Sequence, residues 1–396
     1  MELIVKTLRE IRERNLYPKI HSLFSAVDPE VTVDGKKMLL FCSNDYLGLA
    51  NHPKVKEKAI EAIYQYGVST CASRLISGNT ELHNKLERLI ADFLFQEEAI
   101  VLTTGYMTNT GVIPALVNGV NIFSLFPRKT LIISDELNHA SIIDGCKESR
   151  TKIIIFPHRD TKRLEKILKK YKRTRKIIIT DAVFSMDGDI APIPEIVGLA
   201  KKYNALTMID EAHSIGVLGR TGRGILEYFN LPFNAIDILM GTLSKAIGSI
   251  GGYIAGSRNL IDFLRVTVRS YIFTASPLPP PSVAAAIAAI EYIKSNPSIV
   301  ESLQKNAEYL RNKFKENKFE ILETQTPIIP LMLYEEQKAI RFADRLFDYG
   351  ILAPCVRWPA VPKGKARIRC VVMANHNISQ LDKLIEACVK VREELG

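Results

Sequence analysis

The sequence predicts an α/β fold, with a mainly parallel seven-stranded sheet covered by helices and a smaller α+β domain after it. From residue 99 to residue 255, apolar runs too short for helices alternate with helical stretches, which is the order expected of a parallel sheet. A proline cluster, Pro277-Leu-Pro-Pro-Pro281, then ends this pattern. The chain has 396 residues and is 47% hydrophobic, which suffices for a large core and two domains.

The elements expected before the sheet are a helix over residues 1–15, a strand over 37–41 and amphipathic helices over 53–66 and 80–95. The seven strands are expected over residues 99–102, 130–133, 152–156, 176–179, 205–209, 237–240 and 252–255. The elements expected after the prolines are helices over 282–295 and 299–317, strands over 319–322 and 328–333, a helix over 335–349, strands near 351 and over 366–372, and a helix from 379. We therefore expect an N-terminal segment (1–48), a large cofactor-binding domain (49–283) and a small C-terminal domain (284–396).

Composition places the chain among soluble globular proteins and argues against several other classes. No apolar run reaches membrane-spanning length, and the charged N-terminus resembles an amphipathic helix more than a secretory signal. The six cysteines are scattered and form neither a disulfide framework nor a Cys-x-x-Cys metal pair, so we expect a reduced, cytoplasmic protein without a metal site. The net charge of +10 suits anionic partners, either nucleic acid or small molecules carrying phosphates and carboxylates.

Chemistry-bearing residues follow two of the predicted strands. Asp210 and His213 come directly after one strand, and Lys245 follows another through a Thr-Leu-Ser loop. Ligands collect at the carboxyl ends of strands in open α/β sheets, so these side chains are expected to converge on one small molecule. A partly desolvated lysine is a candidate Schiff-base nucleophile, and a carboxylate at the edge of a buried strand needs a cation or hydrogen-bond donors beside it.

Several motifs, in one order along nearly the whole chain, resemble the α-oxoamine synthases. They are Asn44-Asp-Tyr-Leu-Gly, Ser73-Arg-Leu-Ile-Ser-Gly78, Gly105-Tyr-x-x-Asn109, Asn138-His-Ala-Ser, Phe184-Ser-Met-Asp-Gly, Ile209-Asp-Glu-Ala-His213, Gly241-Thr-Leu-Ser-Lys245, Tyr271-Ile-Phe-Thr274 and Val361-Pro-Lys-Gly-x-Ala-Arg-Ile-Arg369. The resemblance implies an aspartate-aminotransferase-like fold of type I and pyridoxal 5'-phosphate (PLP) as cofactor. It also implies condensation of an amino acid with an acyl-CoA thioester, with release of CoA and usually CO2.

The resemblance also implies roles for individual residues at the cofactor. Lys245 would hold it covalently and later act as general base, and Asp210 would keep the pyridine nitrogen protonated. His213 and Ser185 would bind the phenolic oxygen, while His139 would stack on the ring and serve in catalysis.

Two further groups are implied by the same resemblance. The phosphate would be met by Thr242, by the N–H groups of Gly105 and Tyr106 at a helix start, and by Thr274 of a partner subunit. The chain would then be an obligate homodimer with its active site at the subunit interface. The substrates would be bound by Arg369, which would clamp the amino-acid carboxylate with help from Asn44, and by Arg14 at the acyl site, while Arg367 supports Arg369.

The sequence leaves the substrate pair open. Several stretches resemble members that join alanine to pimeloyl-CoA in biotin synthesis, but Ala360 stands where those members usually carry a threonine. Residues 361–369 are closer to members that join glycine to acetyl-CoA. Serine palmitoyltransferase-like, 5-aminolevulinate-synthase-like and ordinary aminotransferase activities stay open. The stretch over residues 121–128 is a few residues longer than the turn usual in the family. It is expected to form either a surface loop or part of a channel wall.

Two other readings fit less well. Asp210-Glu-Ala-His213 spells the DEAH box of RNA helicases, but Gly35-Lys36 and Gly364-Lys365 are not followed by Ser or Thr, so an ATP-binding loop is missing. A silent partner subunit of the same fold would be expected to lack a lysine at position 245. We therefore expect no nucleic-acid or membrane partner.

Overall fold

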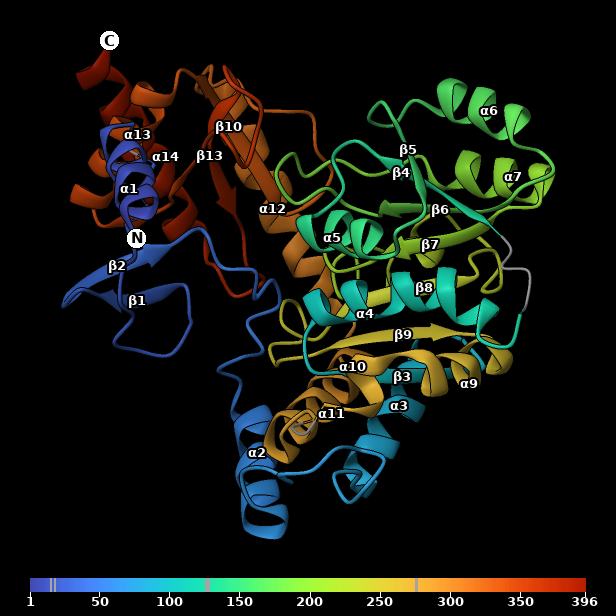
Figure 1. Ribbon diagram of the computed structural model, residues 1–396. Coiled ribbons are helices and arrows are strands. Elements are labelled where there is room, and N and C mark those ends of the chain that lie inside the picture. Colours follow the sequence, from blue (N-terminus) through green and yellow to red (C-terminus); the bar gives the residue numbers. More distant parts are fainter. Residues whose placement is uncertain (15, 18, 125–128, 275–276) are drawn as a thin grey trace.

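The structure is a computed structural model that describes residues 1–14, 16–17, 19–124, 129–274 and 277–396. Its centre is a seven-stranded sheet in the order β3-β9-β8-β7-β6-β4-β5 (Figure 1). The strands are β3 (Glu98–Leu102), β4 (Thr130–Asp135), β5 (Lys152–Phe156), β6 (Arg175–Asp181), β7 (Leu206–Asp210), β8 (Ile238–Thr242) and β9 (Gly252–Gly256). Only β9 runs against its neighbours β3 and β8. The expected mainly parallel sheet is confirmed.

Helices cover both faces of this sheet because successive side chains of each strand point to opposite sides. Ile209 of β7 belongs to one apolar cluster and its neighbour Met208 to another. The first cluster is completed by helices α2 (Pro53–Tyr66), α3 (Glu81–Phe93), α6 (Thr161–Lys170), α7 (Ile193–Tyr203) and α11 (Pro280–Ser295). The second is completed by α4 (Gly105–Asn118), α5 (Ala140–Glu148) and α9 (Arg258–Thr267). The result is a three-layered unit.

The C-terminal part forms a smaller antiparallel sheet of β10 (Ile328–Tyr334), β13 (Ala366–Val371) and β12 (Cys355–Val356). It packs with helices α12 (Ser298–Glu316), α13 (Glu336–Asp348) and α14 (Ile378–Leu395) around a third apolar cluster. The N-terminal hairpin of β1 (Glu30–Val33) and β2 (Lys36–Leu40) lies beside these elements, since β2 pairs with β11 (Ile351–Leu352) (Figure 1).

Two expectations about strands were wrong or incomplete. Residues 319–322 form no strand, and only Ile321 makes an isolated bridge, to Leu331. Pro330 accepts a hydrogen bond from Leu322 N–H but has no N–H to return, so the ladder stops there. The short strands β1 and β12 were not expected. A turn at Asp34-Gly35, both with positive φ, joins β1 to β2 and is a recognised hairpin signal.

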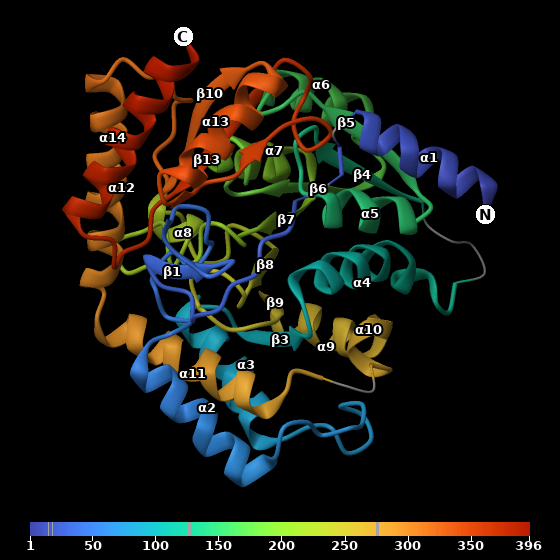
Figure 2. The same cartoon turned by 90° about the vertical axis from the view of Figure 1, so that its left-hand side faces the viewer.

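Helix α1 (Glu2–Glu13) buries none of its side chains, and in Figure 2 it projects beyond the other elements. Three short helical segments complete the fold: η1 (Gly119–Asn121), α8 (Ile225–Tyr228) and α10 (Arg269–Ile272). Among the residues that the structure describes, no helix is long and apolar enough to cross a membrane.

Candidate active site

The candidate site lies where β6, β7 and β8 end side by side. In the sheet register Asp181 is opposite Asp210, and Asp210 is opposite Met240. A cavity of about 250 Å³ opens there. Its lining residues are Thr104, Gly105, Tyr106, Asn109, His139, Ser141, Asp181, Ser185, Asp210, Ala212, His213, Met240, Thr242, Ser244 and Lys245.

Most of the residues expected to bind a cofactor meet in this cavity, although they come from several separate segments between residues 105 and 245. The eight that line it are Gly105, Tyr106, His139, Ser185, Asp210, His213, Thr242 and Lys245. Four other candidates do not line it, and they are Asn44, Arg369, Arg14 and Thr274. The first two are connected to the site by hydrogen bonds, as described below.

Lys245 carries the amine of the site. Its Nζ lies 2.8 Å from Nε2 of His213, whose Nδ1 lies 2.6 Å from the hydroxyl of Tyr46. Burial lowers the pKa of Lys245 to about 8, against the opposing charges of Asp210 and Asp181. Burial and the nearby Lys245 also hold the pKa of His213 well below its usual value. His213 is therefore neutral, and an ammonium at Lys245 can donate to it.

Asp210 is held in one orientation at the end of β7. Its side chain is buried, with 2% of the residue exposed. One carboxylate oxygen accepts from Asn109 Nδ2 at 2.8 Å and the other from the N–H of Ala212 at 2.9 Å. Asn109 was part of a recognised motif but had no expected role, although its position one turn after Gly105 in α4 places both on one helix face.

A second carboxylate, Asp181, was missed from the sequence. Its Oδ2 accepts from the backbone N–H of His139 at 2.8 Å, while His139 Nδ1 lies 2.7 Å from Ser141 Oγ. Burial and the charge of Asp210 raise the pKa of Asp181 well above its usual value. Desolvation lowers the pKa of His139, which lines the cavity. The available signal was that Asp181, like Asp210, stands at the end of a short buried strand rich in apolar residues.

A candidate anion-binding cradle forms part of the lining of the same cavity. The N-cap Thr104 accepts from Met107 N–H, and Gly105 and Tyr106 occupy the first turn of α4, where N–H groups lack helical partners. Thr242 and Ser244 add hydroxyl groups 2.8 Å apart. A Cβ on Gly105 would lie 3.2 Å from Thr242 Oγ1. The glycine therefore leaves room between the helix start and the hydroxyl groups.

The two arginines of β13 have different partners. Arg367 is 2% exposed and forms an ion pair with Asp187 at 2.6 Å. Arg369 donates to the carbonyl oxygen of Ser185 at 2.5 Å and to Asn44 Oδ1 at 3.3 Å. Arg369 also interacts with the hydroxyl group of Tyr46. All of these partners are neutral oxygens, so the charge of Arg369 is open to a carboxylate ligand.

Two expected residues lie away from the cavity within one chain. Arg14 is exposed at the C-terminal end of α1. Thr274 follows α10 and donates its hydroxyl to the carbonyl oxygen of Ser270. Of the long 121–128 stretch, residues 125–128 lie outside the described part of the chain.

These residues fit PLP. A carboxylate fixed by two donors suits a pyridinium nitrogen, an amine of lowered pKa suits an aldehyde, and the helix start with two hydroxyl groups suits a phosphate. Together with the mainly parallel seven-stranded sheet, they define a PLP enzyme of fold type I.

Comparison with known proteins agrees with this class. A model of the family "Aminotransferase class I and II" matches residues 36–388. The 8-amino-7-oxononanoate synthases of Thermoanaerobacter pseudethanolicus and Thermosipho melanesiensis are each 45% identical to this chain, with all of this chain and 98% of each relative covered. The chain belongs to the aminotransferase class I and II family and, within it, to the PLP-dependent α-oxoamine synthases.

Solved structures share the fold over almost the whole chain. A serine palmitoyltransferase from S. paucimobilis with a bound PLP–myriocin aldimine superposes with a TM-score of 0.91 at 31% identity, over 99% of this chain and 97% of that one. An 8-amino-7-oxononanoate synthase from Francisella tularensis gives a TM-score of 0.75 at 26% identity, over 90% and 98%. The TM-score measures backbone agreement, so the substrate is better judged from the sequence identities.

The lowered pKa of Lys245 has a measurable consequence. Only the neutral amine attacks an aldehyde, so capture of PLP by the apoprotein is expected to accelerate as the pH rises and to level off above about 8. Stopped-flow absorbance between pH 6 and 10 measures this, with free lysine amide as the reference. A rate that keeps rising to pH 10, as for free lysine, would contradict a lowered pKa.

Proposed function

We propose that the chain condenses L-alanine with pimeloyl-CoA and releases CoA and CO2, which is the reaction of the 8-amino-7-oxononanoate synthases. One observation supports this substrate pair: the chain is 41–45% identical, over nearly its full length, to curated 8-amino-7-oxononanoate synthases. PLP chemistry itself is supported by the juxtaposition of Lys245, His213 and Asp210 in one cavity.

The proposed cofactor contacts are assigned from the charged and polar side chains that line the cavity. PLP supplies an electron sink for the carbanion formed at the amino-acid Cα. Asp210, fixed by Asn109 and Ala212, would keep the pyridine nitrogen protonated, and His213 and Ser185 would bind the phenolic oxygen. His139 would cover one face of the ring.

The phosphate contacts are proposed at the start of α4 and at the end of β8. Thr242 and the N–H groups of Gly105 and Tyr106 would bind the phosphate within one chain. Thr274 would be added from a second copy.

Lys245 is the proposed general base. Its pKa of about 8 leaves a usable neutral fraction near neutral pH, so the amine can accept the Cα proton and later return it. In the structure Nε2 of His213 lies 2.8 Å from this amine, which keeps the side chain of Lys245 among the residues that would bind the cofactor.

Arg369, assisted by Asn44, is proposed to bind the carboxylate of alanine. Arg369→Lys keeps the charge but loses the planar fork, so the KM for alanine is expected to rise about 10-fold or more. Steady-state kinetics at saturating pimeloyl-CoA measure this. The KM for pimeloyl-CoA serves as the internal control and is expected to stay within about 2-fold; an equal rise in both would show general damage.

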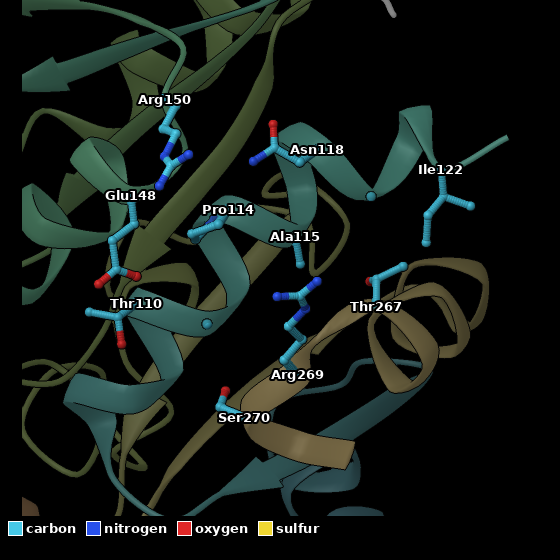
Figure 3. A pocket seen from close by; sticks show the side chains of 12 residues that line it. Thr110, Pro114, Ala115, Asn118, Ile122, Glu148, Arg150, Thr267, Arg269 and Ser270 are labelled. Atoms are coloured by element: carbon cyan, nitrogen blue, oxygen red, sulfur yellow. The ribbon is translucent and has the colours of Figure 1, made fainter. Parts of the chain in front are cut away.

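A homodimer is the second part of the proposal. Thr274 can reach a phosphate in another copy only if the face that carries α10 lies at the interface. A cavity of about 740 Å³ opens on this face between α4, α5, α9 and α10, and Figure 3 shows Arg269 reaching from α10 toward Ala115 of α4. Nearby, Ser270 Oγ is buried with no hydrogen-bond partner among the described residues, and Phe273 is 71% exposed. A second copy would cover this surface.

Sedimentation equilibrium tests the assembly. We expect a particle of about twice the chain mass of 44.4 kDa that persists at micromolar protein concentration. A particle of single-chain mass that still binds PLP and turns over substrate would contradict the proposed contribution of Thr274.

The function is tested by thiol release from a panel of acyl-CoA and amino-acid pairs. Pimeloyl-CoA with alanine is expected to be fastest, ahead of acetyl-CoA with glycine and palmitoyl-CoA with serine. Arg14→Ala is expected to raise the KM for pimeloyl-CoA, which ends in a carboxylate, without affecting acetyl-CoA. A preference for palmitoyl-CoA and serine would favour the function of the serine palmitoyltransferases that share this fold.

A further inference from the structure

The loop formed by residues 184–189 connects the two halves of the site. Its Ser185 lines the cavity, and the carbonyl oxygen of the same residue accepts from Arg369. The next two residues accept hydrogen bonds from Nη1 of Arg367, Met186 through its carbonyl oxygen at 3.0 Å and Asp187 through Oδ1 at 2.6 Å. Any displacement of this loop therefore moves a cofactor contact and the substrate arginine together.

The far end of the loop is held by an ion cluster outside the cavity. Asp189 Oδ2 lies 2.9 Å from His158 Nε2 and 3.0 Å from Arg159 Nη1. The other ring nitrogen of His158, Nδ1, lies 3.0 Å from Oδ1 of Asp135, the last residue of β4. The imidazole packs edge-on against Phe184, at the start of the loop, with 4.3 Å between ring centroids.

The two carboxylates determine the charge of this histidine. Each ring nitrogen faces a carboxylate oxygen, and only an imidazolium can donate from both nitrogens. Burial alone would lower the pKa of His158, but the hydrogen bonds to Asp135 and Asp189 outweigh it and raise the pKa to about 9. His83, a buried histidine bonded to Leu278 O and Thr80, has its pKa lowered to about 4 by burial.

We propose that His158 is a positioning residue, which as an imidazolium ties loop 184–189 to the end of β4 and thereby fixes Ser185 and the carbonyl group that orients Arg369. This proposal rests on the proposed function, because it assigns the amino-acid carboxylate to Arg369. Replacing a whole buried ion pair by apolar packing is often neutral for stability, so net stability alone does not account for this cluster. The effect that we assign to it is fixing the loop in one position.

The decisive variant is His158→Gln, which fills a similar volume but cannot carry the charge. The matched control is His83→Gln, which also removes a buried histidine but lies outside loop 184–189 and its contacts. Hydrogen exchange followed by mass spectrometry is expected to show about 10-fold faster exchange of the peptide spanning residues 183–190 in His158→Gln only. The KM for alanine is expected to rise about 10-fold while kcat and the KM for pimeloyl-CoA change less than about 3-fold.

Asp189→Asn provides an independent route to the same result, because it weakens the acceptor and keeps the ring of His158. This variant is expected to show the same faster exchange and the same rise in the KM for alanine, each with a smaller amplitude. If His158→Gln does not fold, Asp189→Asn tests the proposal in its place. Unchanged exchange of residues 183–190 in both variants, or a fall in kcat without a rise in the alanine KM, would overturn the proposal. The exchange readout needs no turnover, so an enzyme that condenses other substrates leaves this test intact.

The charge of His158 gives a pH signature. The charged groups facing it are Asp135 at the end of β4, Asp189 of the loop, Arg159 beside it, and Glu136, whose carboxylate accepts from the backbone N–H of His158 at 3.4 Å. Because the folded pKa is raised from 6.5 to about 9, the stabilisation is complete below pH 6.5 and is lost as the pH rises through about 9. The Tm difference between wild type and His158→Gln is expected to shrink across this range, and a constant difference would contradict an imidazolium.

Discussion

Lys245→Ala is expected to lower the rate of CoA release by about 10⁴-fold, because it removes both the amine that holds PLP and the proposed general base. The same variant is expected to lose the visible absorbance of bound cofactor after dialysis. His213 would also lose the amine that lies 2.8 Å from its Nε2. Assays of thiol release and absorbance spectra on the same preparations measure the two effects.

Lys176→Met is the matched control. Lys176 is also buried, in β6, and its amine donates to the carbonyl oxygens of Lys172 and Thr174, away from the cavity. Burial lowers its pKa as well. This variant is expected to keep the cofactor absorbance and most of the activity. Retention of absorbance in Lys245→Ala, or its loss in Lys176→Met, would place the cofactor elsewhere.

Asp210→Asn is expected to lower kcat by about 10²–10³-fold while leaving the fold intact, because the amide cannot hold a proton on the pyridine nitrogen. Asn109 and the N–H of Ala212 both donate to this carboxylate. The NH2 group of an asparagine at position 210 would therefore face a donor where it needs an acceptor. Single-turnover kinetics of Cα-proton exchange with deuterated alanine isolate the affected step.

Glu211→Gln is the control for this substitution, since Glu211 is the adjacent buried acid but does not line the cavity. Its Oε2 accepts from Ser214 and from the N–H of Ile225, whereas its Oε1 is buried and has no partner in the part of the chain that the structure describes. A glutamine can keep both accepted bonds with its oxygen. Activity within about 3-fold of wild type is expected, and an effect as large as that of Asp210→Asn would point to general damage.

The sheet was predictable because each strand is a short apolar run that ends abruptly in polar or small residues. Ile177, Ile178 and Ile179 show why: the run is buried on both sides, so neighbouring residues enter different apolar clusters. Weaker elements were not predictable in the same way. The 319–322 stretch has the composition of a strand, yet Pro330, which lies opposite it, cannot donate a backbone hydrogen bond. The sequence alone does not show which residues pair with this stretch.

The site residues that follow strands could be identified from the sequence, while those that orient them could not. Tyr46 supports His213, and its separation from that residue by 167 positions gives no local signal. The same holds for His158, whose two carboxylate partners come from β4 and from loop 184–189. These contacts depend on the order in which the strands lie side by side in the sheet. The apolar pattern of the individual strands does not determine that order.

Carboxyl-labelled alanine tests the central claim most directly. With alanine carrying ¹³C in its carboxyl group and with pimeloyl-CoA, we predict labelled CO2 and free CoA in equal amounts, both abolished in Lys245→Ala. Transfer of the amino group to a 2-oxo acid, without CoA release from any acyl-CoA, would contradict it and identify an ordinary aminotransferase.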